Sequence, residues 1–93
     1  MNYLKKFGIS SKQINELKEK YNEGIIEFIT NNEIFVIDII KYLYSENITY
    51  IYLLMNNNIK IFLETKISLQ KKINKMKKDG FSVKAMVMKL IED

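Results

Sequence analysis

The tetrapeptide Asp79-Gly80-Phe81-Ser82 repeats the pattern of Glu46-Asn47-Ile48-Thr49, which lies 33 residues earlier, and of Phe7-Gly8-Ile9-Ser10 near the N-terminus. In each copy a Gly or Asn is suited to a left-handed helix C-cap, an apolar residue follows, and a Ser or Thr can then cap the next helix. Each copy therefore predicts the end of one helix and the start of another. A spacing of about 30–35 residues is typical of helical arrays, in which each unit buries its apolar face against the next.

The spacing of apolar residues between these turns predicts the helices themselves. Ser10 and Gln13 form a capping-box pattern before an amphipathic helix that extends to Phe28, within which a break or kink at Gly24 is an alternative. Residues 34–44 are apolar on nearly all sides of a helix, so we expect them to form the central core element. Helical spacing recurs within residues 66–78 and 83–91. The pattern predicts an all-α fold, as a small helical bundle or short helical-repeat array, in a single domain spanning residues 1–93.

Residues 48–64 allow a second interpretation. β-Branched and aromatic residues on both sides of Asn56-Asn57-Asn58 resemble two strands joined by a turn. The alternative is therefore an α+β fold with a hairpin at about residues 48–64. The repeated turn pattern favours a helix, because it places Tyr50, Leu53 and Leu54 in register with the helix predicted after Ser82.

The composition of the chain argues against most kinds of catalysis. Histidine, cysteine, arginine, tryptophan and proline are all absent, and histidine and cysteine are the side chains that most often hold metals or activate nucleophiles. We therefore expect no enzyme activity, no catalytic residue, no metal site and no cofactor. The first eight residues lack the apolar run of a signal peptide, and the longest apolar stretches are shorter than the ~20 residues that span a bilayer. The sequence thus predicts a soluble, cytoplasmic protein with no membrane partner.

Lysines are concentrated in residues 66–78, which contain six lysines and no acidic residue. Residues 1–20 carry a formal charge of +3, residues 21–64 carry −4 and residues 65–93 carry +5. On a helix, Lys71, Lys75 and Lys78 lie opposite the apolar face, with Lys72 beside them. These four are the candidate nucleic-acid-binding residues, because lysines neutralise phosphates without reading sequence. The alternative is a solvated face enriched in lysine by an A/T-rich genome, such as that of a low-GC bacterium or its phage.

Tyrosines cluster in the acidic middle segment. Tyr42, Tyr44, Tyr50 and Tyr52 lie within eleven residues of one another, and tyrosine is enriched at protein interfaces. These four are the protein-interface candidates. They support a second hypothesis, in which a small inhibitor from a phage or mobile element, of the anti-restriction or anti-CRISPR type, binds and occludes a host protein. A third hypothesis is a homo-oligomeric adaptor whose apolar surface completes its own core.

From about Ile40 to Ile91 the chain resembles the helical repeats of the mitochondrial transcription termination factor family. The resemblance is carried by Asn58-Ile59-Lys60-Ile61-Phe62-Leu63, Ile73, Met76, Gly80-Phe81-Ser82 and Met86. Such repeats commonly have a proline where this chain has Asn58. The resemblance implies a right-handed array of paired helices whose basic concave surface binds double-stranded nucleic acid, and it implies no catalytic residue.

The favoured function is that of a non-enzymatic helical binding protein for nucleic acid or a nucleoprotein. Base-specific readout commonly uses arginine in a two-bond contact with guanine, and this chain has no arginine. We therefore expect the lysine-rich face to bind with little sequence specificity.

Overall fold

The computed structural model describes residues 1–92, and it confirms the predicted all-α fold. The elements in chain order are two short 3₁₀ helices and six α-helices: η1 (Asn2–Phe7), α1 (Ser11–Lys20), α2 (Glu23–Asn31), α3 (Glu33–Ser45), α4 (Ile51–Asn57), η2 (Ile59–Phe62), α5 (Lys66–Lys78) and α6 (Val83–Glu92). Residues 1–92 contain no strand. The alternative hairpin at residues 48–64 is therefore wrong, since that segment forms α4 and η2.

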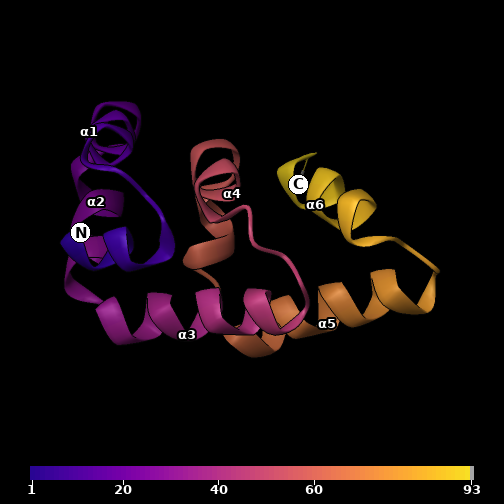
Figure 1. The fold of residues 1–93 in the computed structure, drawn as a ribbon. Coiled ribbons are helices and arrows are strands. Elements are labelled where there is room, and N and C mark those ends of the chain that lie inside the picture. The colour runs from indigo at the N-terminus through magenta and orange to yellow at the C-terminus, as the bar shows by residue number, and fades with distance from the viewer. Residues whose placement is uncertain (93) are drawn as a thin grey trace.

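The helices are arranged in two rows along an elongated body of 36 × 23 × 21 Å. In Figure 1, α1, α4 and α6 stand side by side across the top, while α3 and α5 run along the bottom. Contacts between α1 and α4, between α4 and α6, and between α3 and α5 connect the members of each row. The arrangement is that of a small all-α bundle.

The repeated turn has the same backbone geometry in all three copies. Gly8, Asn47 and Gly80 adopt left-handed conformations, with φ of 83°, 64° and 83°. The N–H of the apolar residue that follows then donates to a carbonyl five residues earlier: Ile9 to Leu4 at 3.3 Å, Ile48 to Leu43 at 2.9 Å and Phe81 to Met76 at 2.9 Å. A backbone bond of this span together with a left-handed residue is typical of a Schellman-type helix C-terminus. The predicted helix ends are therefore confirmed.

Side-chain caps start two of the three following helices. Ser10 Oγ accepts from the N–H of Gln13, and Ser82 Oγ accepts from the N–H of Ala85, each at 3.1 Å. Thr49 does not cap α4, because the helix starts later and Tyr50 occupies its N-cap position without a side-chain bond.

The predicted helix from Ser10 to Phe28 is two helices. α1 ends at Lys20, and the side chain of Asn22 accepts from the N–H of Ile25 at 3.0 Å to begin α2. The chain breaks before Gly24 because asparagine readily caps a helix N-terminus and competes with a continuing helix. The apolar face continues from α1 to α2, since residues of both helices pack on the same core.

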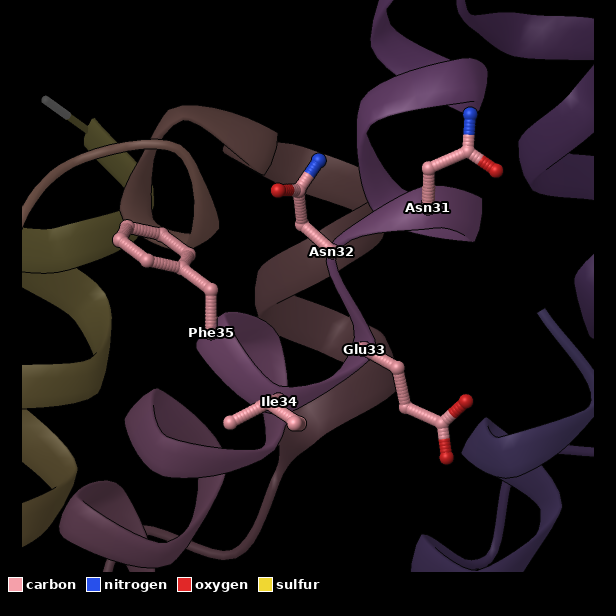
Figure 2. Close-up of a pocket in the computed structure, with 5 residues that line it drawn as sticks. All are labelled: Asn31, Asn32, Glu33, Ile34 and Phe35. Atoms are coloured by element: carbon pink, nitrogen blue, oxygen red, sulfur yellow. The ribbon is translucent and has the colours of Figure 1, made fainter.

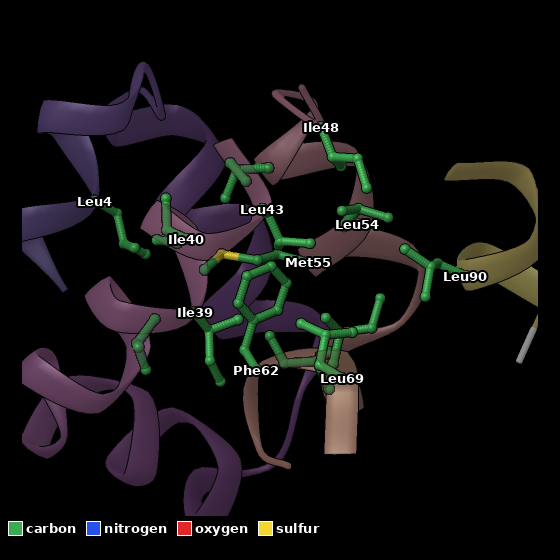
Figure 3. Close-up of a cluster of buried hydrophobic side chains, with 14 of the residues drawn as sticks. Leu4, Ile39, Ile40, Leu43, Ile48, Leu54, Met55, Phe62, Leu69 and Leu90 are labelled. Atoms are coloured by element: carbon green, nitrogen blue, oxygen red, sulfur yellow. The ribbon is translucent and has the colours of Figure 1, made fainter. Parts of the chain in front are cut away.

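The buried apolar side chains form one cluster from Tyr3 to Leu90. Figure 3 shows side chains from α3, α4 and α5 converging around Phe62 of η2, which is fully buried. As predicted, α3 supplies much of this core, through Val36, Ile39, Ile40 and Leu43. Ile34, in its first turn, is an exception, because this side chain is 86% exposed. No helix in residues 1–92 has the length and apolar character needed to cross a membrane.

Candidate nucleic-acid interface

The helix α5 presents one buried edge and a broad exposed face. Thr65 caps its start by accepting from the N–H of Ser68 at 3.2 Å. Leu69, Ile73 and Met76 are buried at steps of three and four residues, so they share one side of the helix. The lysines of the helix lie around the rest of its circumference.

Three lysines of α5 form ion pairs with carboxylates of neighbouring segments. The nitrogen–oxygen distances are 3.2 Å for Lys66–Asp38, 2.9 Å for Lys72–Glu64 and 2.9 Å for Lys77–Glu46. Ion pairs at the protein surface contribute about 0–1 kcal/mol each. Their main consequence is that these three positive charges are already neutralised within the protein.

The pair at Glu46 is the most enclosed of the three, since the side chain of this glutamate is only 15% exposed. Tyr42 also donates its hydroxyl hydrogen bond to Glu46 at 3.0 Å. The hydrogen bond from Lys77 holds the pKa of Glu46 below its usual value, against the opposing effect of burial. Burial, together with the hydrogen bond to Glu46, raises the pKa of Tyr42 above its ordinary value. Tyr42 is thus engaged inside the protein rather than offered to a partner.

The other three lysines of α5 form an exposed row, Lys71, Lys75 and Lys78, which we call the lysine strip. Within residues 1–92, no carboxylate oxygen lies within 4.0 Å of their Nζ atoms. Spacings of three and four residues place them next to one another, where like charges repel by a few tenths of a kcal/mol per pair. The strip is therefore a surface of concentrated positive charge that the described protein does not neutralise.

A pocket of about 250 Å³ adjoins this strip where α5 meets α6. It is lined by Lys72, Lys75, Met76, Asp79, Phe81 and Lys89. Lys75 belongs to both the strip and the pocket, so the two features are continuous. We call this hollow the Phe81 pocket.

Sequence reasoning identified the strip but missed Phe81 and Lys89. The available signal for Phe81 was the third copy of the turn pattern, which has an aromatic residue where the earlier copies have isoleucine. No comparable signal marked Lys89, because its position beside α5 depends on how α6 packs. The structure also separates Lys72 from the other candidates, since its ammonium group is paired with Glu64.

The four candidate tyrosines do not form one surface. The ring of Tyr44 packs edge-on against Phe7, with centroids 5.9 Å apart, and Tyr42 contacts Glu46. Tyr52 points toward α1, where its hydroxyl donates to Glu16 at 2.5 Å and this bond raises the pKa of Tyr52 to about 12. Only Tyr50 faces α6, and it is 59% exposed.

Tyr50 lines an apolar groove of about 520 Å³ between α4 and α6. The other lining residues are Leu53, Val83, Lys84, Val87 and Met88, of which Leu53 and Met88 are also exposed. An exposed apolar surface of this kind is a feature of protein-binding sites. We call it the α4/α6 groove.

A larger hollow, of about 760 Å³, lies at the turn between α2 and α3. Figure 2 shows that its lining side chains, Asn31, Asn32, Glu33, Ile34 and Phe35, fan out in different directions. Ligand sites have a few polar groups that converge on one point, and this turn has none. Its volume reflects an open surface between two helix ends, so we assign no site to it.

Within the part of the chain that the structure describes, no three acidic side chains come together to form a possible metal site. The sequence matches no protein-family model, and comparisons with curated proteins and with solved structures find no significant similarity. The resemblance to transcription termination factor repeats therefore stays a prediction, and function has to be argued from the geometry of the surface.

Proposed function

We propose that this chain is a non-enzymatic helical binding protein that engages nucleic acid or a nucleoprotein through the lysine strip. The observation that carries the proposal is that three of the six α5 lysines form ion pairs and, in the part of the chain that the structure describes, the other three do not. Lys66, Lys72 and Lys77 are neutralised by carboxylates, whereas the strip is exposed and has no acidic partner within residues 1–92.

The dimensions of the strip suit a phosphate backbone. With a rise of about 1.5 Å per residue, the seven steps from Lys71 to Lys78 cover roughly 10 Å. Each strand of a DNA duplex carries one negative charge per ~3.4 Å along the axis, so this length corresponds to about three phosphates. Three lysines therefore face about three charges.

Such contacts supply affinity without reading sequence. Phosphate neutralisation releases condensed counterions, which makes binding favourable and strongly dependent on salt. Lysine is a flexible point charge, and the chain has no arginine for two-bond readout of guanine. The resemblance to transcription termination factor repeats implies a duplex as the ligand, but the strip can contact the phosphates of a duplex or of a single strand.

The test is a salt titration of binding to labelled DNA with two matched variants. The first, K71Q/K75Q/K78Q, removes the strip; the second, K5Q/K6Q/K12Q, removes the same charge from exposed lysines of η1 and α1. These lie toward the opposite end of the elongated body (Figure 1). Both variants have the same net charge, so a difference between them reports position rather than overall charge.

We expect the strip variant to flatten the plot of log affinity against log salt, and the control to follow the unmodified protein. At about 0.9 counterions per phosphate contact, three lost contacts change the slope on duplex DNA by about 2.7. Equivalent behaviour of the two variants, or absence of binding even at low salt, contradicts the proposal.

A second candidate function is supported by the α4/α6 groove. Its exposed residues Tyr50, Leu53 and Met88 form an apolar surface that a protein partner could cover. Under this hypothesis the chain acts as a phage or mobile-element inhibitor, or as a homo-oligomeric adaptor. Tyr50→Ala then weakens partner capture or self-association, as measured by pull-down or light scattering, while the strip variant leaves it unchanged. The nucleic-acid proposal makes the reverse prediction.

A further inference from the structure

Phe81 departs from its counterparts in the repeated turn. Ile9 and Ile48 occupy the equivalent positions in the first two copies and are 2% and 0% exposed, whereas Phe81 is 38% exposed. Its backbone is held as firmly as theirs, because its N–H donates to Met76 at 2.9 Å and Gly80 has the same left-handed φ. The third turn therefore presents an aromatic ring at a defined position on the surface.

Positive charge surrounds this ring. The Phe81 pocket contains three lysines, Lys72, Lys75 and Lys89, and one carboxylate, Asp79. Lys72 is paired with Glu64, but the Nζ atoms of Lys75 and Lys89 have no carboxylate oxygen within 4.0 Å in residues 1–92. A ligand in this pocket meets an apolar aromatic face and two cations that are not neutralised.

That combination of groups matches a nucleotide. Bases stack on aromatic side chains regardless of sequence, and cations beside the ring contact the phosphates on either side. At about 250 Å³ the pocket is smaller than the ~300–1,000 Å³ of sites that enclose drug-sized ligands. It is suited to a single planar group whose backbone stays outside.

We propose that the Phe81 pocket takes one unpaired base of single-stranded nucleic acid, with adjacent phosphates on Lys75 and Lys89. This inference rests on the proposed function, because the strand reaches the pocket along the lysine strip through the shared residue Lys75. It goes further by selecting the ligand class. A base in a duplex is paired and stacked within the helix, so its faces are not open to Phe81.

The test compares labelled single-stranded DNA with a duplex of the same length, for the unmodified protein and for Phe81→Leu. Leucine keeps an apolar side chain at the turn but has no aromatic face. Tyr50→Leu is the matched control, since it removes an exposed ring from the α4/α6 groove and leaves the Phe81 pocket intact. Circular dichroism melts establish that each variant folds.

We expect the unmodified protein to prefer the single strand, and Phe81→Leu to lose about fivefold or more in affinity for it, the fold-change that a stacking contribution of ~1 kcal/mol or more represents. Duplex binding should stay constant in both single-residue variants. In the unmodified protein, the Phe81 ring protons should shift in NMR spectra when a single-stranded oligonucleotide is added.

The outcomes separate this inference from the function on which it rests. If K71Q/K75Q/K78Q weakens binding but Phe81→Leu does not, and the ring protons are unmoved, the base pocket is wrong and the lysine strip remains. If neither strand form binds at low salt, both proposals are overturned. Equal loss of single-strand affinity in Phe81→Leu and Tyr50→Leu also overturns the pocket, because the effect is then not local to it.

Discussion

Replacing Gly80 by alanine should destabilise the protein, although no neighbouring atom obstructs the new methyl group. Gly80 has a φ of 83°, and a Cβ built on it meets no heavy atom within 4 Å. The cost is therefore conformational, at roughly 1–2 kcal/mol for an L-residue in the left-handed region. Alanine also lowers the conformational entropy of the unfolded chain, which stabilises the folded state by about 0.4–1 kcal/mol and offsets part of this cost. We expect a net loss of about 1 kcal/mol.

Gly24→Ala is the matched control, and it should have the opposite sign. Gly24 lies in the first turn of α2, and its added Cβ would be 3.4 Å from Oδ1 of Asn22, an ordinary van der Waals contact. Glycine within a helix costs about 0.5–1 kcal/mol relative to alanine. The same chemical change should therefore stabilise the protein at residue 24 by up to about that amount.

Urea unfolding followed by circular dichroism measures both effects. For a domain of this size a change of 1 kcal/mol also shifts the melting temperature by about 4–8 °C. A neutral or stabilising Gly80→Ala variant would refute the assignment of the repeated turn as a left-handed cap. Loss of stability in both variants would instead indicate that α2 does not tolerate a side chain at residue 24.

Three further predictions concern the core, the ion pairs and the Phe81 pocket. Leu54→Ala should cost about 2–5 kcal/mol in urea unfolding, because Leu54 is fully buried and truncation leaves a cavity; a loss below about 1 kcal/mol would contradict its place in the core. The lowered pKa of Glu46 means that its charged form stabilises the fold above the carboxyl's unfolded pKa, and that this contribution is lost as the pH falls through the folded pKa. Thermal melts across acidic pH should therefore show that the difference in melting temperature between the unmodified protein and Glu46→Gln shrinks as the pH falls. A difference in melting temperature that does not change with pH would contradict the ion pair. Asp79→Asn removes the one carboxylate that residues 1–92 place in the Phe81 pocket and should tighten single-strand binding by a few-fold at low salt, which the DNA titration measures; unchanged affinity would mean that the strand does not pass this pocket.

Helix ends were predictable from the sequence because their determinants are local. The left-handed cap depends on one residue, Gly8, Asn47 or Gly80, and on the apolar residue that follows it. The break between α1 and α2 was expected only as an alternative, and at Gly24 rather than at Tyr21–Asn22, because the apolar spacing from Ile14 to Phe28 continues across it. The local signal for its true position was Asn22, whose side chain starts α2.

The segment after Ile48 shows tertiary packing overriding local preference. Its β-branched and aromatic residues have high strand propensity, which measures how well a side chain fits a half-buried pleated surface. Here Ile51, Leu54 and Met55 are buried at helical spacing on α4, between α1 and α6. The core formed by neighbouring helices decides the conformation, and the local composition of residues 48–64 does not contain that information; the signal for a helix was the turn pattern repeated 33 residues later.

The candidate sites also differ in whether local sequence or tertiary packing determines them. The lysine strip was predictable because positions on one helix face follow from helical geometry alone. The tyrosine surface was not, because residues two positions apart on a helix point in different directions. Tyr52 contacts α1 and Tyr50 faces α6, so these two tyrosines lie on opposite sides of α4 although they are close in sequence. The Phe81 pocket depends on the packing of α5 against α6, which composition and spacing do not reveal.

Segregation of charge along the sequence also limits how strongly the C-terminal part can bind nucleic acid. The acidic segment of residues 21–64 supplies Asp38, Glu46 and Glu64, and each is paired with a lysine of α5. Of the eight lysines in residues 65–93, five remain without such a partner in the described chain. Five contacts correspond to a salt slope of about −4.5 on a duplex, and about −3.5 on a single strand. A steeper measured slope would require lysines outside residues 65–93 to reach the same ligand, and if these are lysines of η1 or α1, K5Q/K6Q/K12Q would cease to be a neutral control. Because that triple variant distinguishes the two cases, the magnitude of the slope reports how much of the array the nucleic acid covers.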